Sequence, residues 1–154
     1  MMLEEIKLDA EKIAELMPQQ SPYMFIDQAL IRPNEVFGKY TIKGNEFFLK
    51  GHFKNNPVMP ASIMMEALGQ LGVLYLLAAP DSEMPVKADA SKIFFASADG
   101  VRCSKICRPG ETLEMNLRIE KLRAPICLCS GRISTQDQRA VIVEKISLTF
   151  ELKK

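Results

Sequence analysis

The chain has 154 residues, of which 47% are hydrophobic and 25% charged, and its formal net charge is +1. This length suits a single domain, expected to span residues 1–154, with enough apolar material for a hydrophobic core. The balanced charge, the absence of basic runs and the lack of tryptophan argue against nucleic-acid binding as the main function.

The first third of the chain predicts a short helix followed by a strand hairpin. Apolar residues recur at near-helical spacing over residues 8–17, and Pro18 ends this helix. Residues 22–31 have the composition of a strand, and an Arg-Pro-Asn-Glu turn leads to a second strand over residues 36–44. The short connection predicts that the two strands pair as a hairpin.

The next segment is the most apolar of the chain and predicts a buried helix. An irregular loop over residues 45–57 leads to a helix over residues 61–79, with Pro60 suited to its first turn. Its apolarity approaches that of a transmembrane span, but Glu66 and Gln70 interrupt it and no basic flank follows. We therefore expect a core helix of a soluble protein.

The remainder of the chain predicts antiparallel strands. Residues 91–107 form a long candidate strand with a bulge or bend near Gly100. Residues 112–122, 124–134 and 140–152 follow, and the first of these alternates clearly between apolar and polar side chains. The elements together predict an α+β fold, in which a curved antiparallel sheet wraps around a long central apolar helix.

The cysteines give no clear sign of a metal site. The spacings of Cys103, Cys107, Cys127 and Cys129 match no common zinc pattern, and we expect reduced thiols that act as small apolar residues. A four-thiolate metal site or disulfides are the alternatives. The acidic, amphipathic first seventeen residues do not resemble a secretory signal, so we expect a cytoplasmic protein.

Polar side chains interrupt the predicted helix at intervals of four residues. Ser62, Glu66 and Gln70 therefore lie along one face. Burial of a lone carboxylate is costly, so Glu66 is expected to have a raised pKa or to find partners, which makes it a candidate general acid or base. The structural alternative is a solvated edge or a satisfied polar network in the core.

The only histidine of the chain, His52, precedes Glu66 by fourteen residues. A lone histidine in a loop is usually incidental, and His52 by itself would support no assignment. However, Pro57 and Pro60 restrict the loop that joins His52 to the helix. A base on such a loop, at the mouth of an apolar tunnel, suits chemistry on an apolar substrate.

The segment GHFKNNPVMPASIMMEALGQ resembles the signature G-H-F-P-x-x-P-[VIL]-[MF]-P-G-x-x-x-x-E-A-x-x-Q of the hot-dog-fold 3-hydroxyacyl-ACP dehydratases, where ACP is acyl carrier protein. It is most similar to their Glu-type, non-isomerising branch. The resemblance continues in MPQQSPYMFIDQAL, IKGNEFFLKGHF and FASADGVRCSKICRPGETLEM, and it covers most of residues 9–150. It implies the hot-dog fold, the architecture in which a curved sheet wraps around one helix.

The resemblance also implies catalytic roles. His52 would abstract the α-proton of a (3R)-3-hydroxyacyl thioester, and Glu66 would protonate the leaving hydroxyl, so that water departs and a trans-2-enoyl thioester remains. The backbone N–H of Ala61, at the helix N-terminus, would polarise the thioester carbonyl. The other expected substrate-binding residues are Gly51, Phe53, Pro60, Gln70, Phe95 and Ala96.

The partners implied by the resemblance are an acyl carrier protein and a second copy of the chain. In the homodimer, or a trimer of such dimers, His52 of one subunit would face Glu66 of the other. Proton transfer requires no cofactor or metal, and none is expected. A basic rim is expected to meet the acidic carrier protein. It comprises Lys50, Lys54, Lys105 and Arg108.

Several positions depart from the family pattern, among them Lys54, Ala61, Ser97 and Cys103. A specialised relative that serves polyketide, polyene or polyunsaturated chains is therefore considered beside the enzyme of primary fatty-acid synthesis. One alternative function is that of a hot-dog acyl thioesterase, which does not need the His–Glu pair. Another is a non-catalytic acyl-carrier-binding subunit, which would bind carriers without turnover.

Overall fold

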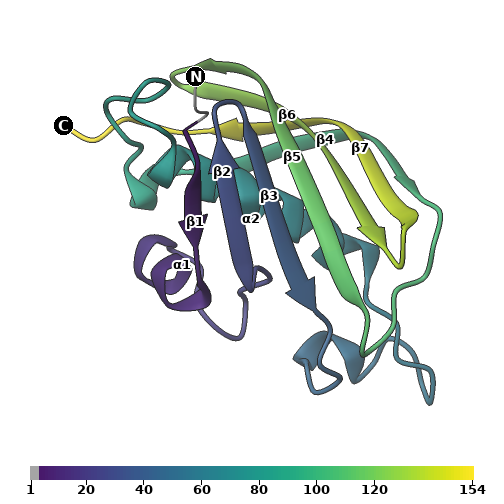
Figure 1. Cartoon of the computed structure of the whole chain (residues 1–154). Coiled ribbons are helices and arrows are strands. Elements are labelled where there is room, and N and C mark those ends of the chain that lie inside the picture. Colours follow the sequence, from purple (N-terminus) through teal and green to yellow (C-terminus); the bar gives the residue numbers. More distant parts are fainter. Residues whose placement is uncertain (1–3) are drawn as a thin grey trace.

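The computed structural model describes residues 4–154, which form one seven-stranded antiparallel sheet around a central helix (Figure 1). The strand order across the sheet is β1-β2-β3-β5-β6-β7-β4. The strands are β1 Ile6–Leu8, β2 Gln28–Arg32, β3 Glu35–Thr41, β4 Phe94–Cys103, β5 Thr112–Arg123, β6 Ile126–Thr135 and β7 Gln138–Thr149. The α-helices are α1 Ala10–Leu16 and α2 Ala61–Ala78, and short 3₁₀ turns occupy Phe47–Leu49 and Ala90–Lys92. The predicted hot-dog fold is confirmed.

Alternating side chains place one face of the sheet against α2. In β5, Leu113, Met115 and Leu117 are buried, whereas Glu114 and Arg118 are exposed, as the sequence pattern predicts. The predicted hairpin between β2 and β3 is also confirmed, with antiparallel pairing along the whole of β2. The apolar face of each strand is thereby turned toward the helix.

α2 lies in the concave face of the sheet and contacts β3, β5, β6 and β7. Close approach depends on glycine. A Cβ added to Gly72 would lie 2.6 Å from Leu148, and one added to Gly38 would lie 2.6 Å from Leu71. Within residues 4–154, α2 is the one helix whose length and apolarity would suit a membrane crossing, but 72% of it is buried inside the protein. The prediction of a buried core helix is confirmed.

The N-terminal region differs from the sequence predictions in three ways. The helix predicted over residues 8–17 begins only at Ala10, because Leu8 belongs to β1. The strand predicted over residues 22–31 begins only at Gln28. The preceding backbone, at Tyr23 and Phe25, instead bonds to the side-chain amide of Gln70. β1 has no counterpart among the predicted elements, because its three residues are too few to show a period.

The irregularity predicted in β4 lies earlier than expected. The register against β7 shifts between Phe95 and Ser97, at Ala96. Gly100 instead takes a left-handed φ of 65°, and the pairing on either side of it stays in register.

The cysteines are all free, as predicted. Cys127 and Cys129 are buried on the same face of β6, with 3.5 Å between their Sγ atoms. The neighbouring Cys127 thiol, together with burial, raises the pKa of Cys129, so that it remains a thiol. The pair packs as small apolar residues.

Candidate active site

His52 lies in a loop, residues 51–58, that folds back on itself before α2 begins. The Val58 N–H donates to the His52 carbonyl at 2.8 Å, and the His52 N–H donates to the Leu49 carbonyl at 3.3 Å. Phe53 and Asn56 close the tip with reciprocal backbone bonds of 2.8 and 3.0 Å. The loop therefore has a defined shape, although residues 53–57 are exposed.

The imidazole of His52 is oriented by the same loop. Its Nδ1 lies 2.9 Å from the Val58 carbonyl oxygen, which can only accept a hydrogen bond, so Nδ1 carries the hydrogen. In the neutral ring the lone pair is then on Nε2, the atom that can take up a proton. The ring of Phe53 packs beside the imidazole, with 3.9 Å between the centroids. The Val58 carbonyl thus orients the imidazole, a contact that the sequence patterns do not reveal.

Glu66 projects from α2 and is half-buried. Burial raises the pKa of Glu66 above its ordinary value, and a hydrogen bond from Gln70 opposes part of that rise. At a given pH, a larger fraction of these carboxyl groups therefore carries a proton. This is the protonation state that a general acid requires.

Gln70 is fully buried and ties Glu66 to the segment before β2. Its Nε2 donates to Glu66 Oε2 and to the Tyr23 carbonyl, at 3.1 Å in each case, while its Oε1 accepts from the Phe25 N–H at 2.9 Å. In this chain Gln70 therefore orients the Glu66 carboxylate by a hydrogen bond, and its direct contact with substrate stays a prediction. Burial, and then the charge of Glu66, raise the pKa of Tyr23, a neighbour of the site that the sequence patterns also did not identify.

The N-terminus of α2 offers backbone donors. Pro60 is the N-cap, and its carbonyl accepts from Ile63 N–H at 3.0 Å and Met64 N–H at 3.2 Å. The N–H groups of Ala61 and Ser62 are donors of the first turn that the helix itself leaves unpaired, and both residues are exposed. Such donors can stabilise negative charge on an oxygen.

Phe95 of β4 packs against α2 close to the acid. A Cβ added to Gly69 would lie 2.6 Å from two carbons of the Phe95 ring. Because Gly69 follows Glu66 by three residues, the two positions are neighbours on the helix surface. Phe95 is 40% exposed, so an apolar ring that is partly open to solvent lies against α2 at Gly69, three residues from the acid. The remaining predicted residues are exposed or half-buried: Gly51, Phe53, Pro60 and Ala96.

His52 and Glu66 do not bond to each other within one chain. Among residues 4–154, the imidazole bonds to the Val58 carbonyl and the carboxylate bonds to Gln70. Each group is therefore oriented separately, the first by a loop and the second by a buried amide.

The predicted basic rim is only partly correct. Lys50, Lys54 and Arg108 are exposed. Lys105 instead lies 2.9 Å from a carboxylate oxygen of Glu111, and the two side chains are only 20% and 12% exposed. The charge of Lys105 is thus neutralised inside a loop, because a carboxylate six residues later turns back toward it.

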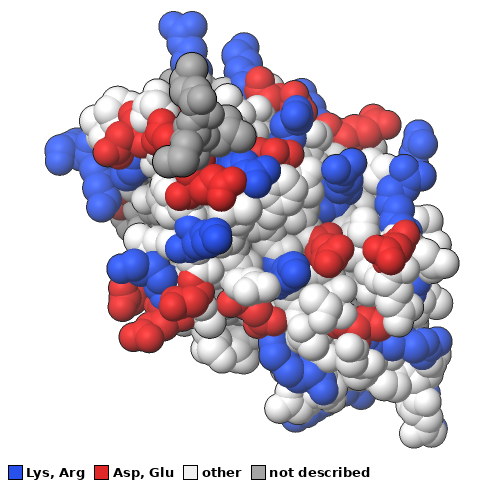
Figure 2. Space-filling model, viewed as in Figure 1, with Lys and Arg blue, Asp and Glu red and all other residues white. Residues whose placement is uncertain are grey.

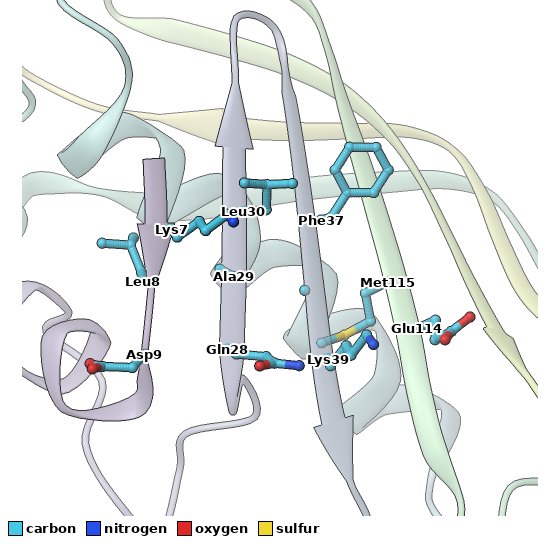
Figure 3. Close-up of a pocket in the computed structure, with 11 residues that line it drawn as sticks. Lys7, Leu8, Asp9, Gln28, Ala29, Leu30, Phe37, Lys39, Glu114 and Met115 are labelled. Atoms are coloured by element: carbon cyan, nitrogen blue, oxygen red, sulfur yellow. The ribbon is translucent and has the colours of Figure 1, made fainter. Parts of the chain in front are cut away.

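A separate groove of about 590 Å³ lies on the outer face of β1, β2, β3 and β5. Figure 3 shows Leu30 and Phe37 side by side on its floor, where they are paired across β2 and β3. None of the predicted site residues lines it. The surrounding surface mixes positive and negative side chains without a patch of one sign (Figure 2). We therefore keep the His52 loop and α2, rather than this groove, as the candidate active site.

Comparisons with known proteins show which family the chain belongs to. Residues 21–144 match the model of the FabA-like domain. The chain is 34% identical to the 3-hydroxyacyl-[acyl-carrier-protein] dehydratase FabZ of Thermomicrobium roseum, over 86% of this chain and 87% of the relative. It is 30% identical to the protein of the same name from Chloroflexus aggregans, over 89% of this chain and 92% of the relative.

A solved structure shares the fold. The dehydratase heterocomplex ApeI:P from Xenorhabdus doucetiae superposes with a TM-score of 0.76 over 94% of this chain and 91% of that chain, at 16% identity. The matched residues 21–144 contain both the His52 loop and α2. The chain belongs to the FabA-like domain family, and its relatives include the FabZ dehydratases.

Proposed function

We propose that the chain dehydrates a (3R)-3-hydroxyacyl-ACP thioester to the trans-2-enoyl-ACP, in fatty-acid or related acyl-chain biosynthesis. The observation that carries this proposal is that one side chain can accept a proton and another is favoured in its protonated form. His52 has its hydrogen on Nδ1 and a free lone pair on Nε2, whereas burial favours the protonated form of Glu66. Dehydration needs one base and one acid in these states.

In the proposed mechanism, Nε2 of His52 removes the α-proton of the substrate. The electrons of that C–H bond form the new carbon–carbon double bond, and the bond between C3 and its hydroxyl oxygen breaks. Glu66 donates its proton to this oxygen, which leaves as water. The N–H of Ala61 stabilises the charge that develops on the thioester oxygen, since the helix N-terminus is positive.

The proposed enzyme is a homodimer that pairs along β4. Among residues 4–154, β4 is hydrogen-bonded to β7 alone, and every residue of β4 except Ala98 is exposed. An exposed apolar edge is normally covered by a partner, and Phe94 is 64% exposed. A second copy would cover β4, and His52 of one subunit would then serve Glu66 of the other. Trimers of such dimers belong to the same proposal.

The proposed substrate carrier is an acyl carrier protein, met by the exposed cations Lys50, Lys54 and Arg108. Arg108 also donates to Asn56 at the tip of the His52 loop, so one of these charges lies against the loop that carries the base. Electrostatic attraction of this kind raises the rate of encounter and is screened by salt. The proposed location is the cytoplasm, where acyl carriers and reduced cysteines would coexist.

The proposal is tested by measuring the hydration of an enoyl thioester, the reverse reaction, together with the release of free thiol. His52→Ala and Glu66→Gln should each lower kcat by about 10²–10⁴-fold, the usual contribution of a general acid or base. Thiol release without hydration would identify a thioesterase instead. Full activity of either variant would remove the role given to that residue.

Mixing the two variants tests whether the site is shared between subunits. A mixed dimer of His52→Ala and Glu66→Gln subunits holds one intact site and one doubly altered site. After random exchange, about a quarter of the wild-type activity should return, because about half of the dimers are mixed. A site built within one chain would recover no activity.

A further inference from the structure

The loop that carries His52 has few buried contacts of its own. Its tip is exposed, and Val58 and Met59 are the residues that enter the core. The Met59 N–H donates to the carbonyl of Cys107 at 2.9 Å, so the loop is bonded to the segment between β4 and β5, residues 104–111. The placement of the imidazole therefore depends on how this second segment is held.

Residues 104–111 are irregular and are held by a carboxylate. Glu111 Oε2 accepts from the Arg108 N–H at 2.5 Å, and Glu111 Oε1 accepts from Lys105 Nζ at 2.9 Å. The two residues bonded in this way, Lys105 and Arg108, lie on either side of Cys107 in the sequence. Cys107 is fully buried, and its carbonyl accepts the hydrogen bond from the Met59 N–H. Burial by itself would raise the pKa of Glu111, but the Arg108 N–H and Lys105 outweigh it, and the pKa lies below its ordinary value.

Glu111 is itself attached to the sheet. Its carbonyl accepts from Ile42 N–H at 3.0 Å, and the Gly110 N–H donates to the Ile42 carbonyl at 2.7 Å. At the other end of the segment, the Ser104 N–H donates to the Ala140 carbonyl of β7 at 2.8 Å. Between these two attachments, the Glu111 carboxylate bonds to Lys105 and to the Arg108 N–H, on either side of Cys107.

We infer that Glu111 is a positioning residue for His52. The connection runs from the Glu111 carboxylate to the backbone around Cys107, from the Cys107 carbonyl to Met59, and from the adjacent Val58 carbonyl to Nδ1 of the imidazole. Loss of the carboxylate would release the Val58 carbonyl from its position, and Nδ1 would lose its acceptor. The inference rests on the proposed function for its effect on catalysis, but its effect on the imidazole can be measured independently.

The test compares Glu111→Ala with wild type in two measurements. Displacement of the base predicts a fall in kcat of up to about 10²-fold with little change in KM. Because His52 is the only histidine, ¹⁵N NMR of the protein gives a single set of imidazole signals, those of His52. These should shift from the Nδ1–H form in wild type toward the Nε2–H form in the variant. Glu111→Asp, which keeps the charge, should recover most of kcat and the Nδ1–H signal.

The pair of Lys87 and Asp81 is a control for the loss of an ion pair. Its residues are also six apart, with 2.7 Å between Lys87 Nζ and the Asp81 carboxylate and a lysine of similar exposure, 23%, but Asp81 is 90% exposed whereas Glu111 is 12% exposed. Asp81→Ala should change neither kcat nor the imidazole signals. Lys105→Ala leaves the bond between the Arg108 N–H and Glu111 and should therefore lower kcat less than Glu111→Ala does. It replaces Glu111→Ala in the test if Glu111→Ala does not fold.

The outcomes separate the two proposals. An unchanged imidazole signal in folded Glu111→Ala overturns the inference, whatever the activity of His52→Ala. So does an equal loss of kcat in the Asp81→Ala control, which would reveal a general effect of removing an ion pair. If His52→Ala is fully active, the proposed function fails, while the NMR comparison still decides whether Glu111 positions the ring.

Discussion

Replacement of Gln70 by leucine removes the buried amide that connects Glu66 to the segment before β2. Leucine is similar in size, so the change deletes hydrogen bonds more than volume. The Phe25 N–H loses its acceptor inside the core, where Phe25 is 1% exposed. An unsatisfied buried donor costs about 1–3 kcal/mol, and loss of the bond to Glu66 brings the expected destabilisation to roughly 2–4 kcal/mol.

Thermal unfolding at equal protein concentration measures this loss. For a chain of this length, about 1 kcal/mol lowers Tm by roughly 2–4 °C, so a decrease of about 5–15 °C is expected. Gln28→Leu is the control, because Gln28 is exposed on β2 and its replacement should change stability by less than about 0.5 kcal/mol.

Activity provides the second measurement for the same variant. Without Gln70, the Glu66 carboxyl loses the donor that orients it, and kcat should fall by about ten- to a hundredfold. A Gln70→Leu protein with the Tm of the Gln28→Leu control would refute the reasoning about the buried donor. Wild-type kcat in Gln70→Leu would refute the positioning of Glu66.

Three further substitutions test separate features. Glu66→Gln should raise Tm relative to wild type at neutral pH. The pKa of Glu66 is higher in the folded protein than its ordinary value of 4.5, so ionisation of this carboxyl favours unfolding as the pH rises above 4.5. Below pH 4.5 Glu66 is protonated in both the folded and the unfolded wild type, and the difference in Tm between wild type and variant should vanish. Gly69→Ala places a methyl group 2.6 Å from the Phe95 ring and should lower the free energy of unfolding by about 1–3 kcal/mol, whereas an unchanged Tm would mean that the ring moves freely. Tyr75→Phe removes the hydroxyl that accepts from the Asn34 N–H and should cost about 0.5–1.5 kcal/mol by urea unfolding, with no change in kcat.

Much of the fold follows from local patterns in the sequence. The alternation in β5 and the long apolar run of α2 each extend over enough residues to define a period. The segment with His52 and Glu66 likewise identifies the family, because its spacing lies within twenty consecutive residues. Short elements such as β1 lack such a signal and were missed, and the start of β2 at Gln28 was predicted six residues too early.

The orientation of the site is decided by bonds between distant parts of the chain. The Gln70 amide replaces strand pairing near Phe25, 45 residues earlier, and the Cys107 carbonyl holds the loop that carries His52. Lys105, predicted as a surface cation, is paired inside its own loop. None of these contacts repeats along the chain, so no periodicity in the sequence predicts them.

The sequence by itself thus determined which groups are available for chemistry: one imidazole, one carboxylate on an apolar helix and a stiff loop between them. Only the tertiary structure decided how they are prepared. It gives Nδ1 of His52 a carbonyl partner, buries Glu66 against a glutamine amide and leaves β4 without a second neighbouring strand among residues 4–154. The physical reason is that residue type and spacing can be read within a short segment of the chain. Protonation states, burial and unpaired strand edges instead depend on which distant segments come into contact.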